Sequence, residues 1–433
     1  MKKQEYYLET LSSGLKVLRV PYEVKSVFSL VLANTGARYE EVKNYGIAHF
    51  FEHMVFKGTQ RYPTAKDIAV RIDGLGAEFN AFTGDEYTGY YIKAASRHVD
   101  IAWEMLSEML LQPILAEEEI EKERGVILEE RRMYIDNPQS HISNKFSEMF
   151  YKGSGLEHNI VGNEQTIKNI GKKDLERFLS KWYELSNLLL VVAGDKHILN
   201  NSNFLGRIDQ FFSVNSKIKR ETAPAREKYL EKDFKYGDKL HIEYRETQQA
   251  HFVLGWPGLK ISDDRRFAAT LLRVILGGNM SSRLFTEVRE KRGLCYYVGA
   301  TMENNLDSGC FGARAGVNLD KIEEALEATM AEFGKITEGA EGITEEELTR
   351  AKEFVTGQTI LGMESLDGVA EGMGFDYLLR GEILTPQEKL AKLAMVKKEE
   401  VVGLARELFK RGEMRLAVIG PYPNADIFTA MLA

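Results

Sequence analysis

Apolar residues recur along the chain with two spacings, and together they predict strands that alternate with helices. Short apolar and β-branched runs between turn residues indicate strands at 15–20, 27–32, 77–83, 87–94 and 187–194. Segments with an apolar residue every three or four positions predict helices at 46–57, 66–74, 99–111, 117–135 and 172–183. A chain that mixes strands and helices in this way is typical of an α+β fold.

The second half of the chain repeats the order of the first half at an offset of about 220 residues. The apolar run at 415–420 corresponds to 189–194, and the run at 308–315 corresponds to 88–95. The sequence therefore predicts two similar domains, each a mixed sheet with helices. Their predicted bounds are 1–215 and 239–433, and a charged linker with turn character joins them at 216–238.

One candidate for chemistry lies in the first half, where residues 49–53 read HFFEH. On a helix, His49 and His53 are one turn apart, so both imidazoles leave the same face, and Glu52 lies beside them. Two imidazoles and a carboxylate form a ligand set that suits zinc, with a fourth position left for water. The alternative is a pair of core histidines with a neighbouring acid. The corresponding positions of the second half, 271–275, contain no histidine.

A third zinc ligand is expected from the acidic helix at 117–135, where Glu129 and Glu130 are adjacent candidates. On a helical wheel, Glu123 and Glu130 fall inside an apolar arc, whereas Glu129 falls on the solvent side. The edges of that arc are formed by Ile120, Ile127 and Tyr134 on one side and by Val126 and Met133 on the other. A carboxylate that faces a core needs a cation or another partner. Glu130 is therefore the predicted ligand, and Glu123 is predicted to orient a ligand histidine. The alternative is that both acids form salt bridges with neighbouring arginines.

The overall composition narrows the classes of function. The formal net charge is −8, which argues against nucleic acid as a partner. Cys295 and Cys310 lack the spacing of a metal site, so the metal ligands must be histidine and carboxylate. The N-terminus resembles neither a signal nor a transit peptide, and no apolar run reaches the length of a membrane span. A soluble cytoplasmic enzyme is expected.

Three segments carry a resemblance to a known family: HFFEHMVFKGT, the strand at 77–83, and ERGVILEERRMYIDNPQ. In order, separation and flanking residues they resemble the pitrilysin/insulinase family of zinc peptidases, and more closely its mitochondrial-processing-peptidase branch. The segment at 281–298 extends the likeness into the second half.

The resemblance implies a role for individual residues. It makes His49, His53 and Glu130 the ligands of one zinc ion, with Glu123 in support. Glu52 becomes the general base for water that attacks the scissile carbonyl. Asn80 and Ala81 match a strand whose edge pairs with the substrate backbone. Arg289 and Tyr296 match a pair in the C-terminal domain that grips the substrate, and Tyr296 would also stabilise the oxyanion.

The resemblance also implies an assembly and an activity. Long family members close four domains like a clamshell, and this chain has two, which corresponds to half of a clamshell. A homodimer is therefore expected, in which each zinc site is completed by Arg289 and Tyr296 of the other chain. The expected activity is a zinc-dependent endopeptidase that takes peptides or unfolded, presequence-like polypeptides as extended strands.

Three alternatives to this function stay open at the level of sequence. The first is a non-catalytic structural or peptide-binding subunit of the same fold. The second is a metal-dependent hydrolase of non-peptide substrates. The third is a peptidase that pairs with a different, inactive subunit.

Overall fold

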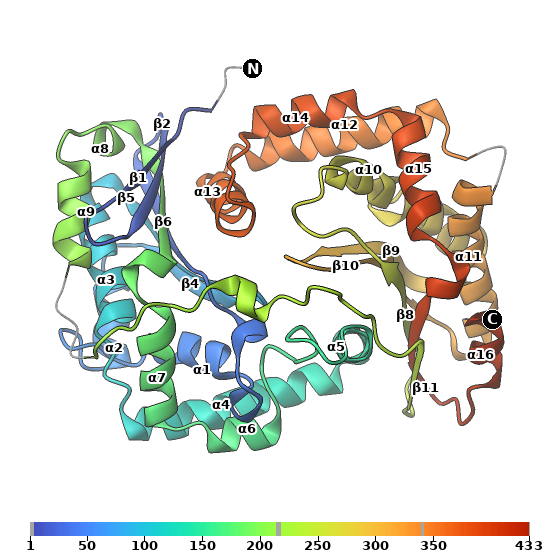
Figure 1. The fold of residues 1–433 in the computed structure, drawn as a ribbon, viewed down its shortest axis with the longest axis horizontal. Helices are drawn as coiled ribbons and strands as arrows, with labels where there is room; N and C mark the ends of the chain where they lie inside the picture. The colour runs from blue at the N-terminus through green and yellow to red at the C-terminus, as the bar shows by residue number, and fades with distance from the viewer. Residues whose placement is uncertain (1–3, 214–217, 339–341, 433) are drawn as a thin grey trace. The chain divides into compact units, whose positions relative to one another are not determined.

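The computed structural model describes residues 4–213, 218–338 and 342–432 (Figure 1). It divides into two compact units, each drawn from three stretches of the chain. Unit 1 comprises Met1–Arg131, His158–Tyr229 and Leu361–Gln387, and unit 2 comprises Arg132–Glu157, Leu230–Ile360 and Glu388–Ala433. Each unit is built on one mixed sheet with helices, which confirms the predicted α+β class.

The two sheets share one topology. The sheet of unit 1 has the order β1-β2-β6-β3-β5-β4, and that of unit 2 has the order β7-β11-β8-β10-β9. The strands of unit 1 are β1 (Tyr7–Thr10), β2 (Lys16–Tyr22), β3 (Ser26–Ala33), β4 (Glu78–Thr83), β5 (Thr88–Ala95) and β6 (Leu188–Asp195). Those of unit 2 are β7 (Leu240–Tyr244), β8 (Ala250–Pro257), β9 (Cys295–Asn304), β10 (Gly309–Val317) and β11 (Arg415–Gly420).

Strand directions agree between the units as well. The pairs β2–β6 and β7–β11 are parallel, and every later pair in each order is antiparallel. The five strands of unit 2 thus reproduce β2, β6, β3, β5 and β4 of unit 1. The internal duplication that was predicted from the apolar runs is therefore visible in the sheet topology.

The helices follow the sequence pattern closely. Those present are α1 (Ile47–Met54), α2 (Ala65–Asp73), α3 (Val99–Leu111), α4 (Glu117–Asp136), α5 (Pro138–Phe150), α6 (Glu164–Asn169), α7 (Lys172–Trp182), α8 (Lys196–Leu199), α9 (Phe204–Phe212), α10 (Arg266–Gly277), α11 (Ile322–Glu338), α12 (Glu345–Gly362), α13 (Leu366–Phe375), α14 (Pro386–Met395), α15 (Lys398–Leu408) and α16 (Asp426–Leu432). Helix α10 occupies the place in the repeat that α1 holds in unit 1, and there Leu271 and Ile275 are core residues.

Helices cover both faces of the sheet in unit 1. Trp103 of α3 donates a hydrogen bond from Nε1 to Oγ of Ser29 at 3.0 Å, which places α3 on the face formed by odd-numbered residues of β3. Helix α13 covers the opposite face, because Gly374 lies directly against Leu32 and Val191. Side chains of β3 that alternate in direction are therefore buried on both sides, which explains its continuous apolar run.

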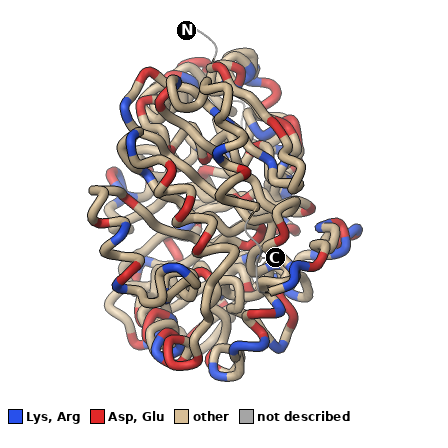
Figure 2. Tube along the Cα trace, turned by 90° about the vertical axis from the view of Figure 1, so that its left-hand side faces the viewer, with Lys and Arg blue, Asp and Glu red and all other residues tan. Residues whose placement is uncertain are grey.

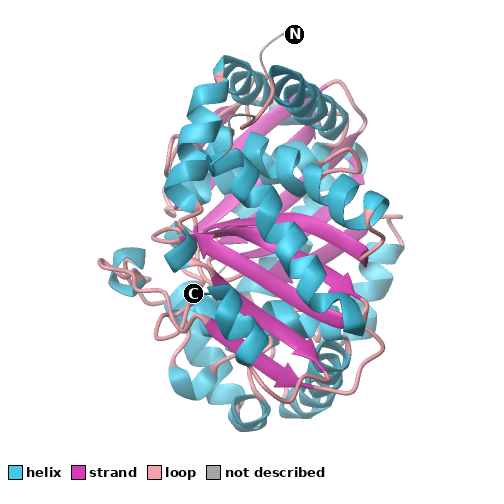
Figure 3. Cartoon of the chain, turned by 90° about the vertical axis from the view of Figure 1, so that its right-hand side faces the viewer, coloured by secondary structure: helices cyan, strands magenta, loops and turns pink. Residues whose placement is uncertain are grey.

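The sheet of unit 2 is also covered on both faces, and helices lie in front of the strands in Figure 3. Phe252 and Leu254 face a large core that includes residues of α10, α11 and α15. Val253, which points the other way, belongs to a second core with Phe146 and Phe150 of α5.

The two covering helices α5 and α13 are exchanged between the halves of the chain. Helix α5 lies in the first half of the sequence but packs in unit 2, and α13 lies in the second half but packs in unit 1. Of the predicted linker at 216–238, residues 216 and 217 lie outside the described residues, and the remainder contains only one short 3₁₀ turn, Arg226–Tyr229. The boundaries 1–215 and 239–433 remain a prediction about the repeat.

The distribution of charge and the hydropathy of the helices also bear on function. Acidic and basic residues are interspersed along the chain trace in Figure 2, and the formal net charge is −8. Among the described residues, no helix combines the length and hydropathy that crossing a membrane requires.

Candidate metal centre

Helix α1 carries the histidine motif, and its first turn is fixed by a carboxylate from outside the helix. The residue before the helix is Gly46, whose φ of 93° favours glycine and which has no side chain to cap the helix. Glu40 takes over this role, because its carboxylate accepts hydrogen bonds from the backbone N–H groups of Gly46 at 2.7 Å and Ala48 at 2.8 Å. These donors would otherwise have no partner at a helix N-terminus.

The C-terminal end of α1 differs from the prediction. The helix ends at Met54 rather than at Lys57. The amides of Phe56 and Lys57 bond instead to the carbonyls of His53 and Met54, three residues back, so the last turn is tightened. This turn brings the Lys57 ammonium group toward α4, where it contacts Glu123.

Three predicted ligands converge beside α1. Nε2 of His49 and Nε2 of His53 each lie 3.5 Å from Oε2 of Glu130 on α4. The three ligand atoms all lie within 4.8 Å of one another. These separations exceed an ordinary hydrogen bond. Zinc bound tetrahedrally at about 2.1 Å places two ligand atoms about 3.4 Å apart, so the donor set fits that ion.

His53 is held from its other ring nitrogen. Its Nδ1 lies 3.1 Å from Oε2 of Glu123, and Oε1 of Glu123 lies 2.6 Å from Nζ of Lys57. Burial alone would raise the pKa of Glu123, but the bonds from His53 and Lys57 outweigh burial and lower it. This arrangement fixes the ring so that Nε2 faces the ligand cluster, which is the support that metal-bound histidines usually have.

The two histidines differ in their electrostatic environment. Burial, reinforced by the nearby His53, lowers the pKa of His49 to about 4, so its imidazole is neutral and able to bind a metal. At His53 burial opposes the charged form, but Glu123 and Glu130 outweigh it and raise the pKa to about 9. Without a metal, a proton on His53 therefore balances the surrounding carboxylates, and a bound cation would replace that proton.

Helix α4 distinguishes the two candidate third ligands as the wheel predicted. Glu130 is half-buried and in the cluster, whereas Glu129 is exposed. Glu123 is buried at 5% exposure. One part of the wheel was wrong, because Val126 and Met133 are 49% and 58% exposed rather than core residues. The buried strip of α4 is thus narrower than predicted and contains Ile120, Glu123 and Ile127.

Glu52 lies on the same helical face as the ligands and is anchored to the neighbouring strand. The hydroxyl of Thr83, the last residue of β4, donates a hydrogen bond to Oε2 of Glu52 at 2.5 Å. Burial raises the pKa of Glu52, and the bond from Thr83 partly offsets that effect. A carboxyl group with a raised pKa next to a candidate metal cluster is suited to accept and return a proton.

Strand β4 runs along this site and is an edge strand of the sheet. It pairs with β5 on one side and is the terminal strand of the order. Asn80 is exposed, and its Oδ1 accepts a hydrogen bond from the N–H of Ala81 at 2.9 Å. Such a terminal strand offers backbone groups for pairing with an added strand.

Arg289 and Tyr296, the predicted substrate pair, lie together in unit 2. Arg289 belongs to a π-helical segment, Phe285–Lys291, a geometry that is frequent at functional sites. Its guanidinium carbon lies 4.7 Å from the ring centroid of Phe285 and 5.7 Å from that of Tyr296. Tyr296 is the second residue of β9 and is 73% exposed, which is unusual for a large aromatic side chain that only packs in a core.

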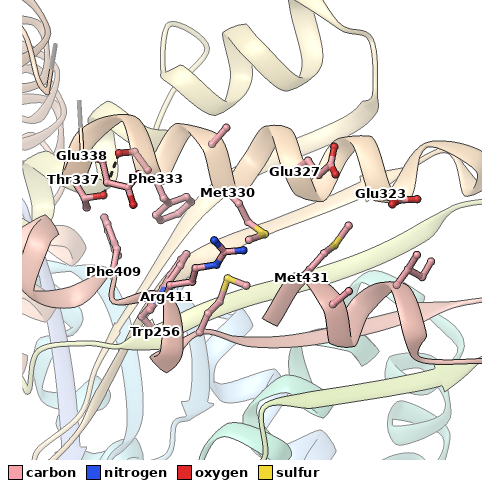
Figure 4. A pocket seen from close by; sticks show the side chains of 15 residues that line it. Trp256, Glu323, Glu327, Met330, Phe333, Thr337, Glu338, Phe409, Arg411 and Met431 are labelled. Atoms are coloured by element: carbon pink, nitrogen blue, oxygen red, sulfur yellow. Dashed lines mark hydrogen bonds between the residues drawn. The ribbon is translucent and has the colours of Figure 1, made fainter. Parts of the chain in front are cut away.

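Unit 2 also has a pocket of about 500 Å³ between α11 and α16 (Figure 4). Trp256, Phe333 and Phe409 form its apolar floor, with ring centroids 4.8–5.1 Å apart. Glu327 and Arg411 also line the pocket and are exposed. The only metal-binding group found among the described residues is the one in unit 1, so the candidate chemistry lies there.

Three residues that support the site were not identified from the sequence. Glu40 caps the N-terminus of α1, Lys57 holds Glu123, and Thr83 holds Glu52. Lys57 has a weak sequence signal, since it lies four residues after His53. Thr83 has a clearer one, because alternate residues of a strand share a face and Thr83 is two positions from Ala81.

Comparison with known proteins shows the family of the chain. Residues 19–164 match the model of the insulinase family, peptidase family M16, and residues 169–355 match the M16 inactive domain. The chain is 34% identical over 423 residues to an uncharacterized zinc protease of Rickettsia felis, covering 97% of this chain and 98% of that protein. It is 33% identical over 419 residues to an uncharacterized zinc protease of Bacillus subtilis, covering 96% and 98%.

Solved structures show the same fold. A protease from Helicobacter pylori superposes with a TM-score of 0.88 at 24% identity, covering 97% of this chain and 100% of that one. An M16 inactive-domain protein from Pseudomonas fluorescens gives a TM-score of 0.86 at 19% identity, covering 96% and 98%. Because the family models and the full-length relatives agree with the resemblance in the sequence, this chain belongs to the insulinase family of peptidases, M16.

Proposed function

We propose that this chain is a zinc-dependent endopeptidase that hydrolyses peptides or unfolded polypeptides bound as extended strands. The observation that carries the proposal is the convergence of His49, His53 and Glu130 next to Glu52. Relatives of nearly the same length are named zinc proteases. The processing-peptidase branch indicated by the sequence stays a prediction.

Metal binding would use the three converging ligands. His49 and His53 supply Nε2 and Glu130 supplies Oε2. A zinc ion held by such a set supplies an acidified water molecule and a Lewis acid for the carbonyl oxygen. Glu123 holds His53 in the orientation that this binding requires.

The proton transfers are assigned to Glu52. Its carboxylate accepts a proton from the attacking water and then delivers it to the leaving amine, which is general base and general acid catalysis by one group. Stabilisation of the developing oxyanion is assigned to Tyr296, whose phenol would donate a hydrogen bond to it. A donor of this kind contributes about 2.7–4 kcal/mol.

Substrate binding is assigned to β4. A peptide that adds as a further strand would pair its backbone with residues around Asn80 and Ala81. Main-chain pairing is independent of side chains, so the enzyme is expected to accept many sequences. Arg289 would bind the substrate from the C-terminal unit.

The assembly that we propose is a homodimer in which Arg289 and Tyr296 of one chain act with the metal site of the other. This arrangement is supported by the family resemblance and by the presence of both elements in one chain.

The function can be tested on the purified chain loaded with one equivalent of zinc. We expect cleavage of a broad peptide library, loss of cleavage with a chelator, and recovery when zinc is restored. Glu52→Gln should keep stoichiometric zinc and lose hydrolysis, whereas His49→Ala should lose both. A zinc-loaded wild type that binds but never cleaves peptides would instead favour the non-catalytic, peptide-binding alternative.

A further inference from the structure

We infer that Thr83 is a positioning residue for the general base: its hydroxyl fixes the Glu52 carboxylate in the orientation needed for proton transfer. This inference rests on the proposed peptidase function. It adds Thr83 of strand β4 to the catalytic residues of the motif on helix α1.

The bond between the two side chains leaves one carboxylate oxygen available. The Thr83 hydroxyl lies 2.5 Å from Oε2 of Glu52, and an ionised carboxylate can only accept, so the hydroxyl is the donor. Among the residues that the structure describes, Oε1 of Glu52 has no hydrogen-bond partner. The hydroxyl therefore holds one oxygen and leaves the other to receive a proton from water.

Thr83 is itself held rigidly. It ends β4 directly opposite Thr88 of β5, whose hydroxyl donates to the carbonyl of Thr35 at 2.9 Å. Helix α1 packs on the same strand, and the ring centroids of Phe56 and Phe79 are 5.8 Å apart. Because strand and helix are fixed to each other, the hydroxyl of Thr83 can set the position of a side chain on α1.

This geometry links substrate binding to proton transfer. The strand that would pair with the substrate backbone also carries the hydroxyl that holds the base. The substrate and the carboxylate of Glu52 are therefore positioned by the same segment of backbone. Glu52 is on a flexible side chain, and an unrestrained carboxylate would spend less time in the reactive orientation. A misplacement of about 1 Å is enough to slow an enzyme roughly 100-fold.

A purely structural role makes a different prediction from a positioning role. If Thr83 only supplied a hydrogen bond to the half-buried carboxylate of Glu52, loss of its hydroxyl would lower the stability of the protein and leave the turnover of the folded enzyme unchanged. If it positions Glu52, its loss lowers kcat while KM and zinc binding stay the same, because the affected interaction acts in the transition state.

The test compares Thr83→Val, which keeps the shape of the side chain, with Thr83→Ser, which keeps the hydroxyl. For zinc-loaded protein we expect Thr83→Val to lower kcat roughly tenfold to hundredfold, with KM and zinc stoichiometry unchanged. Thr83→Ser should restore most of the loss. Thr329→Val is the matched control, since it removes a buried threonine hydroxyl of unit 2 that bonds to the backbone carbonyl of Ala325 at 2.7 Å, and its kcat should match the wild type. Thr83→Ala replaces Thr83→Val if the latter does not fold.

A second readout does not depend on turnover. Crystal structures of the zinc-loaded wild type and Thr83→Ser should show Glu52 turned toward position 83, and Thr83→Val should show it displaced or in several orientations. A wild-type kcat for Thr83→Val, or an unmoved Glu52, would overturn the inference. If the wild type cleaves nothing, the peptidase function itself fails, and the crystallographic comparison still decides whether Thr83 fixes Glu52.

Discussion

Nδ1 of His53 and Oε2 of Glu123 lie 3.1 Å apart, which connects a predicted zinc ligand on α1 to a buried carboxylate on α4. Lys57 holds the other oxygen of Glu123 at 2.6 Å. Glu123 thus fixes His53 and is itself held by Lys57, so the candidate cluster with Glu130 has a defined orientation without a metal.

Replacing Glu123 should weaken metal binding without removing a ligand. We expect Glu123→Gln to lower zinc affinity roughly tenfold to hundredfold, because the amide no longer accepts a full charge-assisted bond from His53. Competition titration with a chromophoric chelator measures the affinity. Glu129→Gln is the matched control on the same helix, since Glu129 is exposed. If the two variants bind zinc equally well, Glu123 has no orienting role.

Stability should depend on pH through Glu347, at the start of α12. Arg283 binds both of its carboxylate oxygens, at 2.6 and 2.8 Å. Burial would raise the pKa of Glu347, but Arg283 and the backbone of Thr344 outweigh it and lower the pKa to about 2. This pKa lies below the ordinary value of 4.5. The ionised Glu347 therefore contributes its full stabilisation of the fold above pH 4.5, and this stabilisation is lost as the pH falls toward 2.

We therefore expect Glu347→Gln to lower the midpoint of thermal unfolding clearly at pH 7 and much less at pH 3, measured by calorimetry. Glu346→Gln is the control, because Glu346 pairs with Arg350 at the surface and is 81% exposed. It should have little effect at either pH. A pH-independent effect of Glu347→Gln would show that its ionisation does not stabilise unit 2.

The exchange of α13 into unit 1 can be tested at Gly374. A Cβ at this position would lie 2.9 Å from side-chain atoms of both Leu32 and Val191, which are fully buried. Gly374→Ala should therefore destabilise the protein by about 1–3 kcal/mol, measured by denaturant unfolding. Gly357→Ala in α12 meets no atom within 4 Å and should be neutral or stabilising. Equal stability of the two variants would contradict the packing of α13 on the sheet.

The candidate metal cluster was readable from the sequence because the geometry of its histidines is local. The i, i+4 spacing of His49 and His53 fixes their shared face, and the wheel of α4 separates Glu130 from Glu129 without knowledge of the fold. The duplication was readable because the corresponding apolar runs lie in the sequence itself, whereas the order of the strands within each sheet was not predicted.

Other features could not be predicted because they depend on partners that are distant in sequence. Glu123 was predicted to orient a ligand histidine, but which of the two histidines it contacts could not be predicted, because its bond to His53 spans 70 residues. The exchanged helices α5 and α13 pack in the unit that does not contain their sequence neighbours. Val126 looked like a core residue by periodicity alone, but whether a helix buries a given strip depends on what packs against it.

The proposed sharing of the active site between two chains predicts complementation. Glu52→Gln lacks the base and Tyr296→Phe lacks the oxyanion donor, so each alone should be nearly inactive. If each metal site works with Tyr296 of the other chain, a mixed dimer contains one site with both defects and one site with neither. Equal mixing with subunit exchange should then restore about a quarter of the wild-type activity, because half of the dimers are mixed and each has one intact site. Peptide cleavage, with the mass of the complex measured in parallel, checks this outcome. If exchange is shown by mass and activity does not return, each site uses Tyr296 of its own chain, since a mixed dimer would then contain two defective sites.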